Sequence, residues 1–354
     1  MLDFLVVGAG LAGVTLAHTF NQRNKKFLMV DPMIPKTSSL VAAGIFNPIT
    51  GKRIVQTWKA DLLFPYLTNF YREIEKKTSA DFLHSMPIYK PFTSIEEQNH
   101  IFSQSSDPAY QKYLKVYTGQ TPYDDVVKNS SGGFETNHSG FLDIPTYVSS
   151  SIQLFSSKSQ FLNDEVLPSQ LVLNKDYVQW KGIEAKKVIF CEGYKAQTNP
   201  FFNWLPFVLT KGEILHLKVE NINEKVILNK NIYILPLGNS TFKAGATYEW
   251  GFENDEITLK GEKEIRDKFE KLVERPYSLI SHEAGIRPTV KDRRPIIGLH
   301  PQYETLGIFN GLGTKGVSIA PYFANQFLDF LEAGKKLDQE VNINRFNSLL
   351  YSND

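Results

Sequence analysis

Six residues near the N-terminus, Gly8-Ala9-Gly10-Leu11-Ala12-Gly13, have the spacing of a turn that binds a dinucleotide phosphate. The first glycine allows a tight bend, the second lets the backbone approach a pyrophosphate, and the third allows close helix–strand packing. Free N–H groups at the start of the following helix favour the phosphate charge. Asp31 lies eighteen residues after Gly13, where a carboxylate accepts a hydrogen bond from a ribose hydroxyl. The pattern predicts a dinucleotide cofactor and does not separate NAD from FAD.

The segments around this turn have the apolar patterns of the elements that such a site needs. A short apolar strand precedes the turn, an amphipathic helix follows it, and a second strand ends at Asp31. Two later strands and a C-terminal helix complete the set. The expected strands cover residues 2–7, 26–30, 187–191 and 306–310, and the expected helices cover residues 11–22 and 318–332.

Two longer segments interrupt these pieces, and both contain short runs typical of β-strands. We therefore expect an α/β fold, in which a Rossmann-type nucleotide domain is built from discontinuous segments and a β-rich substrate domain is inserted twice. The nucleotide domain is assigned to residues 1–80, 142–205 and 283–354, and the substrate domain to residues 81–141 and 206–282. Within the latter, strands are expected at residues 214–219, 232–235 and 242–248.

Composition excludes several other classes of protein. The chain has 354 residues, 42% of them apolar and 22% charged, which favours a packed core of two domains. The formal net charge of +1 does not suit a nucleic-acid-binding surface. Cys191 is the sole cysteine, so we expect no internal disulfide and no metal site. We also expect no signal peptide and no membrane span, which favours the cytoplasm.

Several segments resemble, in order along the chain, the motifs of the D-amino-acid oxidase and glycine oxidase family, whose cofactor is FAD. The resemblance extends from Val6 to about Ala324. It implies the Rossmann-type FAD domain and a small-molecule amine as substrate. The matching segments are residues 38–48, 188–193, 232–236, 244–249, 284–298 and 311–316, the last followed by Ala320-Pro321.

The resemblance also implies which residues bind FAD. A glycine loop at residues 311–316, leading into a helix, would stabilise the negative charge of the reduced flavin. Lys315 would add a positive charge there, or it is an exposed loop lysine. The full predicted set is Gly8, Gly10, Leu11, Ala12, Gly13, Asp31, Ser38, Ser39, Ala43, Gly44, Cys191, Gly193, Gly311, Gly313, Thr314, Lys315 and Gly316.

Four further residues match positions that act on substrate or oxygen in this family. Arg287 matches the arginine that grips the substrate carboxylate, and its planar fork suits that task; the alternative is a structural ion pair. Tyr233 matches a substrate-site tyrosine, or it is a core residue. Lys243 matches the lysine that activates oxygen in sarcosine oxidases, or it faces solvent. Arg53 matches an arginine beside the flavin ring.

Sarcosine oxidases attach their flavin to a cysteine after the Arg-Pro motif, and this chain has none there. We therefore expect non-covalent FAD. The expected reaction is oxidation of the C–N bond of a small carboxylated amine, such as a D-amino acid, glycine or an N-methyl amino acid. Hydride passes to flavin N5, water hydrolyses the resulting imine, and oxygen reoxidises the flavin.

Other readings stay open at this stage. They are a flavin dehydrogenase with a different electron acceptor, an oxidase of the tRNA-modifying type, a flavin-binding protein without turnover, and an NAD-dependent dehydrogenase. The sequence fits several amines and leaves the oligomeric state undetermined. The aromatic candidates for the pocket wall are Trp58, Tyr89, Tyr233, Tyr248 and Trp250.

Overall fold

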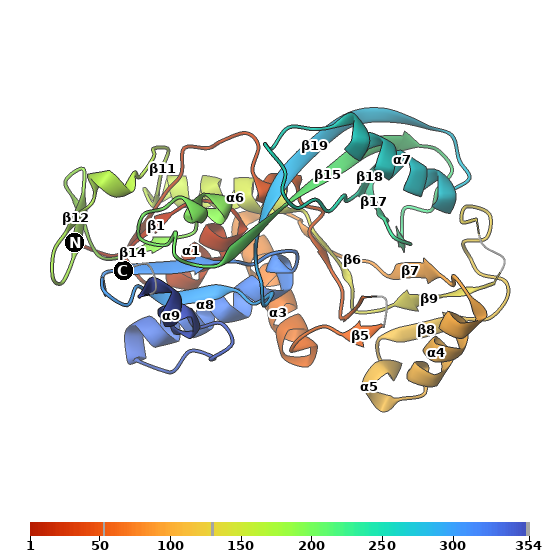
Figure 1. Cartoon of the computed structure of the whole chain (residues 1–354), viewed down its shortest axis with the longest axis horizontal. Helices are drawn as coiled ribbons and strands as arrows, with labels where there is room; N and C mark the ends of the chain where they lie inside the picture. The colour runs from red at the N-terminus through yellow and green to blue at the C-terminus, as the bar shows by residue number, and fades with distance from the viewer. Residues whose placement is uncertain (52–53, 129–130, 352–354) are drawn as a thin grey trace.

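The computed structural model describes residues 1–51, 54–128 and 131–351. It is built around two eight-stranded sheets that lie at opposite ends of the molecule (Figure 1). The chain passes between the two sheets several times, so that each sheet contains strands that are far apart in the sequence. This arrangement confirms the α/β fold class with a Rossmann-type sheet. The exact domain limits given above stay a prediction.

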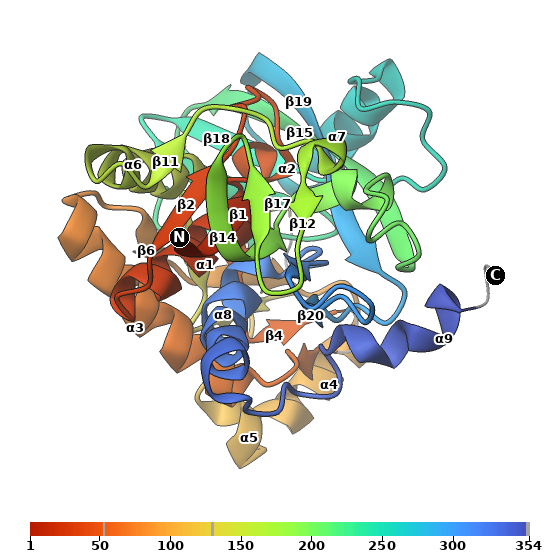
Figure 2. The same cartoon turned by 90° about the vertical axis from the view of Figure 1, so that its left-hand side faces the viewer.

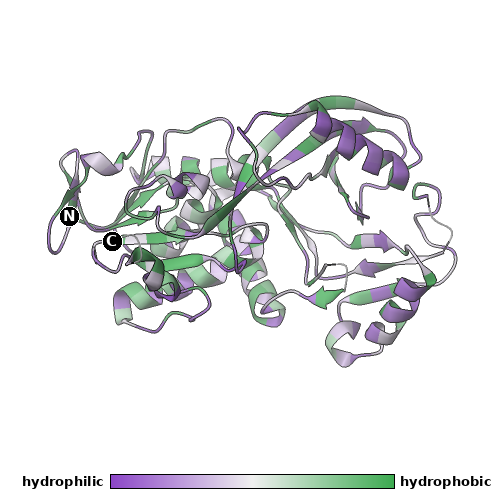
Figure 3. Ribbon diagram, viewed as in Figure 1, coloured by the Kyte–Doolittle hydropathy of each residue, from purple (hydrophilic) through white to green (hydrophobic). Residues whose placement is uncertain are grey.

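The first sheet has a parallel centre. Its spatial order is β11 (Phe161–Leu162), β2 (Phe27–Val30), β1 (Leu2–Val7) and β14 (Ile183–Phe190), and β21 (Leu306–Asn310) pairs with the end of β14. Every residue of β21 is buried, as expected for a strand covered on both faces. These apolar runs appear in green in Figure 3. The carboxyl ends of β1, β2 and β14 meet at one edge, where a ligand of such a sheet binds.

Helices cover one face of this sheet. The helices α1 (Leu11–Gln22), α3 (Ala60–Thr78), α6 (Ile144–Ser157) and α8 (Gly316–Ala333) bury their apolar residues in one cluster with β1 and β2. Figure 2 shows α1 beside α8 under the sheet. The opposite face carries a second cluster that contains Trp180, Phe202 and Trp204. The glycine turn lies between β1 and α1, and both of these elements are packed in the core, which holds the turn rigidly.

The second sheet is largely antiparallel, with the single parallel pair β16–β7. The helix α7 (Leu259–Leu272) packs on it through four buried residues and presents charged residues outward (Figure 3). In spatial order the strands are β19 (Tyr277–Val290), β15 (Phe207–Val219), β18 (Thr241–Gly245), β17 (Tyr233–Gly238), β16 (Ile227–Asn229), β7 (Ile88–Pro91), β9 (Gly133–Thr136) and β8 (Leu114–Tyr117).

The two long strands β15 and β19 form a ribbon that connects the two sheets (Figure 1). They pair from Phe207↔Val290 to Val219↔Tyr277. The end of the ribbon that contains Gly212, Gly285 and Arg287 therefore reaches the edge of the first sheet. This is the element that brings a substrate-domain side chain to the dinucleotide turn.

Shorter elements complete the fold. They are α2 (Ser38–Val41), α4 (Ile95–Ser105), α5 (Pro108–Gln111), α9 (Asn347–Leu350), β3 (Ile45–Phe46), β4 (Ile49–Thr50), β5 (Val55–Gln56), β6 (Leu83–Ser85), β10 (Gly140–Leu142), β12 (Val172–Leu173), β13 (Val178–Trp180) and β20 (Ile296–Leu299). Within the described residues, no helix is long and apolar enough to span a membrane.

Most differences from the predicted elements concern their ends. The strand expected at 187–191 begins at Ile183, because the charged residues at its start pair with β13. The strand expected at 242–248 ends at Gly245, after which the chain leaves β17 and forms a loop. The C-terminal helix begins at Gly316, two residues earlier than expected.

Candidate active site

The turn between β1 and α1 requires glycine at each predicted position. Gly8 has a φ of 103°, and a methyl group there would lie 2.6 Å from the Cys191 carbonyl oxygen. At Gly13 a methyl group would overlap the Gly8 carbonyl oxygen, and at Gly10 it would lie 2.9 Å from Ser39 Oγ. Because Gly10 before α1 has no capping side chain, the positive dipole end and N–H groups of the first turn beyond Leu11 can donate to a pyrophosphate.

Asp31 lies at the end of β2 and connects this strand to the turn. One carboxylate oxygen accepts a hydrogen bond from the Ala9 N–H at 2.7 Å, and the other accepts one from the Met33 N–H at 2.7 Å. Each oxygen retains a further acceptor position. The carboxylate lines the cavity, so it can hold the turn in shape and still accept a hydrogen bond from a ribose hydroxyl of a bound ligand.

A cavity of about 770 Å³ extends from this turn to the ribbon of β15 and β19. Its size is that of a pocket for a large organic ligand. Most of the predicted cofactor residues line it, so the fold brings them together. These are Gly8, Gly10, Leu11, Ala12, Asp31, Ser38, Ser39, Ala43, Gly44, Cys191, Gly193, Gly313, Thr314 and Gly316.

Three predicted cofactor residues lie outside this lining. Gly13 is buried where α1 crosses β1, in agreement with a packing role. Gly311 has a φ of 71° and shapes the loop before α8, facing Val290. Lys315 points away from the cavity, and its ammonium donates to the hydroxyl of Thr50 at 3.1 Å. The glycines therefore contribute conformation, and Lys315 belongs to a neighbouring cavity.

The loop and helix that follow β2 form one wall of the cavity, and the ribbon holds them. The N–H of Leu11 donates to Ser39 Oγ at 3.0 Å, and the hydroxyl of Ser38 donates to the carbonyl of Ile286. These bonds connect the dinucleotide turn, α2 and β19. The helix α2 is thus hydrogen-bonded to the turn on one side and to Ile286, the residue before Arg287, on the other. These two bonds fix the position of Arg287 relative to the turn.

Arg287 lines the cavity with its guanidinium and has no acidic partner within the part of the chain that the structure describes. Its two terminal nitrogens donate to the Thr247 carbonyl at 3.5 and 3.4 Å, and the guanidinium lies 5.4 Å from the Tyr248 ring centroid. Burial lowers the pKa of Arg287, although an arginine remains charged at neutral pH. The remaining donors of the fork are free to bind a carboxylate.

Tyr233 lines the same cavity from β17. Burial raises the pKa of its phenol well above the usual value, against the opposing charge of Arg287. The phenol is therefore protonated and can donate a hydrogen bond. Gly245 on β18 makes room for it, because a methyl group there would lie 2.9 Å from the Tyr233 hydroxyl.

Lys243 lies behind the cavity wall. Its ammonium donates to the carbonyls of Val41 and Ala42, each at 3.3 Å, and these two residues line the cavity while Lys243 does not. Burial lowers its pKa, and the charges of Glu283 and Asp143 partly offset that effect. The lysine is therefore buried, contrary to the solvent-facing alternative, and it supports the segment that follows α2.

The remaining predicted residues fall in different places. Arg53 lies outside the described residues. Of the aromatic candidates, Tyr233 lines the cavity, Tyr248 stacks near Arg287, and Trp250 packs against Tyr248 with 63% of its surface exposed. Trp58 stacks on Phe323, and Tyr89 is in the core of the second sheet.

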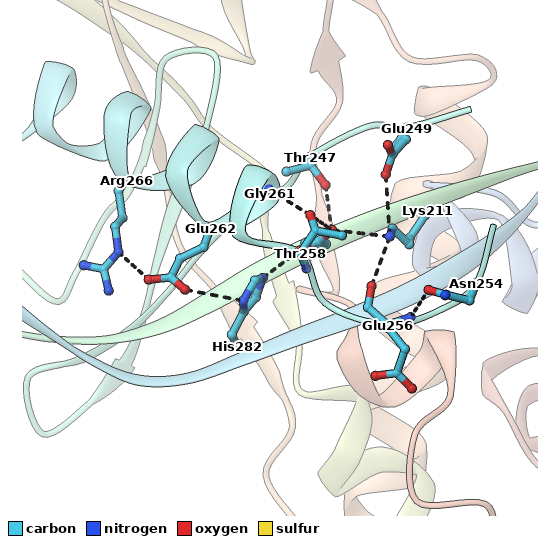
Figure 4. A network of polar contacts seen from close by, with 11 residues as sticks. Lys211, Thr247, Glu249, Asn254, Glu256, Thr258, Gly261, Glu262, Arg266 and His282 are labelled. Atoms are coloured by element: carbon cyan, nitrogen blue, oxygen red, sulfur yellow. Dashed lines mark hydrogen bonds and ion pairs between the residues drawn. The ribbon is translucent and has the colours of Figure 1, made fainter. Parts of the chain in front are cut away.

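Sequence reasoning missed a buried polar network between β15 and the loop of residues 247–258 (Figure 4). Lys211 on β15 donates to the Glu256 carbonyl at 3.0 Å and lies 3.5 Å from Glu213 and 3.6 Å from Glu249. Glu213 accepts from the N–H and hydroxyl of Thr258. The network ties residues 247–258 to the ribbon, and these residues include the Thr247 carbonyl that holds Arg287.

Glu192 was also missed. It lines the cavity beside Cys191 and accepts a hydrogen bond from the Asn199 amide at 2.7 Å. Burial raises the pKa of its carboxyl to about 7, and the nearby charge of Glu165 acts in the same direction. The signal in the sequence was an acidic residue directly after the apolar run of residues 188–191. Among the described residues, no group of three His, Cys, Asp or Glu side chains could hold a metal ion.

Comparison with known proteins agrees with this geometry. Residues 3–329 match the model of the FAD dependent oxidoreductase family. An uncharacterized oxidoreductase of Bacillus subtilis, YurR, is 22% identical over 96% of this chain and 97% of its own length. The crystal structure of iminodiacetate oxidase from Chelativorans sp. BNC1 superposes with a TM-score of 0.78 at 21% identity, covering 97% of this chain and 98% of that one.

A third relative is longer. The tRNA 5-methylaminomethyl-2-thiouridine biosynthesis bifunctional protein MnmC of Leptospira interrogans is 20% identical over 96% of this chain, which spans 58% of that protein. The match with the family model extends over most of the chain, and its motifs form the cavity described above. The chain therefore belongs to the FAD dependent oxidoreductase family, and FAD is its cofactor.

Proposed function

We propose that this protein oxidises the C–N bond of a small carboxylated amine, of the D-amino acid, glycine or N-methyl amino acid type. One observation carries the proposal. The buried guanidinium of Arg287 faces the cavity with no carboxylate partner among the described residues. A buried charge of this kind is costly unless an anion pairs with it, and the carboxylate of the substrate would be that anion.

The chain contributes binding and orientation to the reaction. The fork of Arg287 holds the substrate carboxylate in two parallel hydrogen bonds, and the neutral phenol of Tyr233 offers a third donor from the adjacent wall. When bound, FAD supplies the chemistry by accepting a hydride from the carbon beside the nitrogen. In this scheme the substrate arrives with its amine already deprotonated, so that no side-chain base is required. The imine product is then hydrolysed by water.

The test is an anaerobic titration of the purified holoenzyme with a panel of D-amino acids, glycine and N-methyl amino acids, followed by its visible spectrum. We expect at least one carboxylated amine to bleach the flavin band. A band that none of them bleaches would contradict the proposal. A panel of matching amines without a carboxylate is the control.

We further propose that oxygen is the electron acceptor, with hydrogen peroxide as product. The likeness to an iminodiacetate oxidase supports this choice. Oxygen consumption during turnover would agree with it. Retained reduction of a dye without oxygen consumption would instead assign the protein as a dehydrogenase.

A second candidate is an oxidase that modifies tRNA, which the similarity to MnmC supports. The near-neutral charge of the chain favours a small substrate instead. Anaerobic bleaching by a tRNA that bears an amine-modified base, without bleaching by any free amine, would decide for this candidate.

A further inference from the structure

A second cavity, of about 470 Å³, adjoins the one lined by Arg287. The two cavities share Ile45, Asn229 and Thr314 in their linings, so they meet where β3, β16 and the loop before α8 come together. The far wall of the second cavity is β7, from which Ile88 and Lys90 project on the same face. The cavity of the proposed amine site is therefore continuous with this second chamber, which Arg287 does not line.

The charged residues that line this chamber are mainly basic, with three lysines and one glutamate. Lys90, Lys230 and Lys315 line it, and within the described residues none of them forms an ion pair with a carboxylate. Its one lining carboxylate, Glu97, accepts hydrogen bonds from the N–H and hydroxyl of Thr93 at the start of α4. Glu97 is thus bound to Thr93, and its charge offsets part of the effect of burial on the pKa of Lys90. No carboxylate among the described residues lies at ion-pair distance from the three lysines.

Two of these lysines, Lys90 and Lys315, stand in an environment that disfavours their charge. Burial lowers the pKa of Lys90, whose ammonium lies 5.9 Å from the centroid of the Phe134 ring. Burial also lowers the pKa of Lys315, and repulsion from Arg294 adds to this effect. Neutral hydroxyls of Thr50 and Thr57 hold the Lys315 ammonium at the wall. An anion in the chamber would pair with these ammonium groups and offset their desolvation.

We propose that the chamber binds a second anionic group of the substrate, a carboxylate or a phosphate remote from the oxidised amine. The inference rests on the proposed function, in which Arg287 holds the first carboxylate. The substrate class is then an amine with at least two anionic groups, one on Arg287 and the other on Lys90, Lys230 and Lys315. The amide groups of Asn229 and Asn231 at the same wall offer further donors.

The test is equilibrium binding of unreactive acids to the holoenzyme, measured by calorimetry and by the shift of the flavin spectrum. Butyrate carries one anionic group, glutarate carries two carboxylates, and 4-phosphonobutyrate carries a carboxylate and a phosphonate. Glutarate and 4-phosphonobutyrate, with two anionic groups each, are called two-headed, and butyrate is one-headed. We expect one of the two-headed acids to bind at least about tenfold more tightly than butyrate, because charge-assisted hydrogen bonds are added. Whether glutarate or the phosphonate gains more distinguishes a carboxylate from a phosphate.

Substitutions of the lysines test whether the extra affinity for the two-headed acid comes from the chamber. Lys90→Met and Lys230→Met should each lower the affinity for the two-headed acid toward that for butyrate, and leave butyrate binding unchanged. Lys225→Met, an exposed lysine just before β16 with no part in the chamber, is the matched control and should keep the full preference. Two lysine variants guard against a folding defect in one of them.

The outcomes separate this inference from the proposed function. Equal affinity for one-headed and two-headed acids, unchanged in both variants, would overturn the second site even if a one-headed amine bleached the flavin. A lysine-dependent preference without any amine that bleaches the flavin would support the anion site while the proposed reaction fails. Displacement of the two-headed acid by a short RNA, lost in the same variants, would assign the lysines to a nucleic acid and overturn the inference.

Discussion

At Arg287 the chain places a permanent charge where water cannot fully solvate it, and Thr247 and Tyr248 satisfy it only in part. A bidentate ion pair inside the protein would have occupied the parallel donors that a ligand carboxylate needs. The absence of such a partner among the described residues distinguishes a ligand-binding arginine from a structural one. Lys315 also lacks a carboxylate partner among the described residues, but the sequence predicted it beside the flavin, whereas the structure directs its ammonium to Thr50 and Thr57 in the neighbouring cavity.

Arg287→Ala should lower kcat/KM for a carboxylated amine by at least about a hundredfold, because two charge-assisted hydrogen bonds are lost. FAD content should be retained, since the dinucleotide turn is formed by other residues. Steady-state kinetics and the ratio of flavin to protein absorbance measure the two effects. Arg275→Ala, in the loop before β19 and outside the cavity lining, is the control. Unchanged kinetics in Arg287→Ala would remove the residue from the site.

Glu192 makes the stability of the cofactor-free protein depend on pH. Its folded-state pKa of about 7 lies above the usual value of 4.5 because of burial. The folded state therefore binds this proton more tightly, and stability falls as the pH rises from about 4.5 through 7. Glu192→Gln removes the titration and keeps the acceptor for Asn199, so it should stabilise the protein at pH 8 by up to about 3 kcal/mol.

Thermal melting of the cofactor-free wild type and of Glu192→Gln between pH 5 and pH 8 measures this difference. The gain should shrink steadily toward pH 5. Melting curves that keep a constant separation at every pH would show that the carboxyl does not titrate in this range.

At the scale of elements, the ribbon of β15 and β19 decides the geometry of the site. Gly212 and Gly285 are paired across the two strands. A methyl group on Gly212 would overlap the guanidinium of Arg287, whereas one on Gly285 would meet Ser38 and Val41 at ordinary contact distances of 3.4 Å. The same chemical change at two facing positions thus has different consequences for the arginine.

Gly212→Ala should displace the guanidinium and raise KM for the carboxylated amine at least about tenfold, because the bidentate geometry is lost. Gly285→Ala should have a much smaller effect. Both variants should retain FAD and similar melting temperatures. If the two raised KM equally, the position of Arg287 would not depend on the space at Gly212.

The elements themselves were largely predictable. β1, α1 and β21 are apolar runs next to glycine-rich turns, and this local pattern suffices to place them. The burial of Lys211 and Glu213 was not predictable, because charged residues within a strand ordinarily face solvent. They are buried by the loop of residues 247–258, which folds back over them. Contacts of this kind depend on tertiary packing, which the sequence pattern does not encode.

At the scale of the whole molecule, the site lies where the two sheets meet. The glycine turn comes from the first sheet, whereas Arg287 and Tyr233 come from the second. The motifs predicted the members of the cavity well, since each motif is a short local segment. They did not predict the second cavity, because its lysines come from separate segments around residues 90, 230 and 315 that only the complete fold brings together.

The cavity also argues for non-covalent FAD. Cys191 is the single cysteine and lines the cavity, yet burial raises the pKa of its thiol well above the usual value. The neutral thiol is a poor nucleophile. Acid precipitation of the holoenzyme should therefore release all of the yellow colour into the supernatant, measured by absorbance. Colour that stayed in the pellet, and was lost in Cys191→Ala, would indicate a covalent bond.

The central claim is that Arg287 selects a carboxylated amine for oxidation by FAD. Its most direct test is the anaerobic stopped-flow rate of flavin reduction by the best amine from the panel and by the same amine with its carboxylate converted to an amide. The account predicts that the carboxylate form reduces the wild-type flavin at least about a hundredfold more efficiently, and that this preference disappears in Arg287→Ala. Equal efficiency of the two forms in the wild-type protein would contradict it.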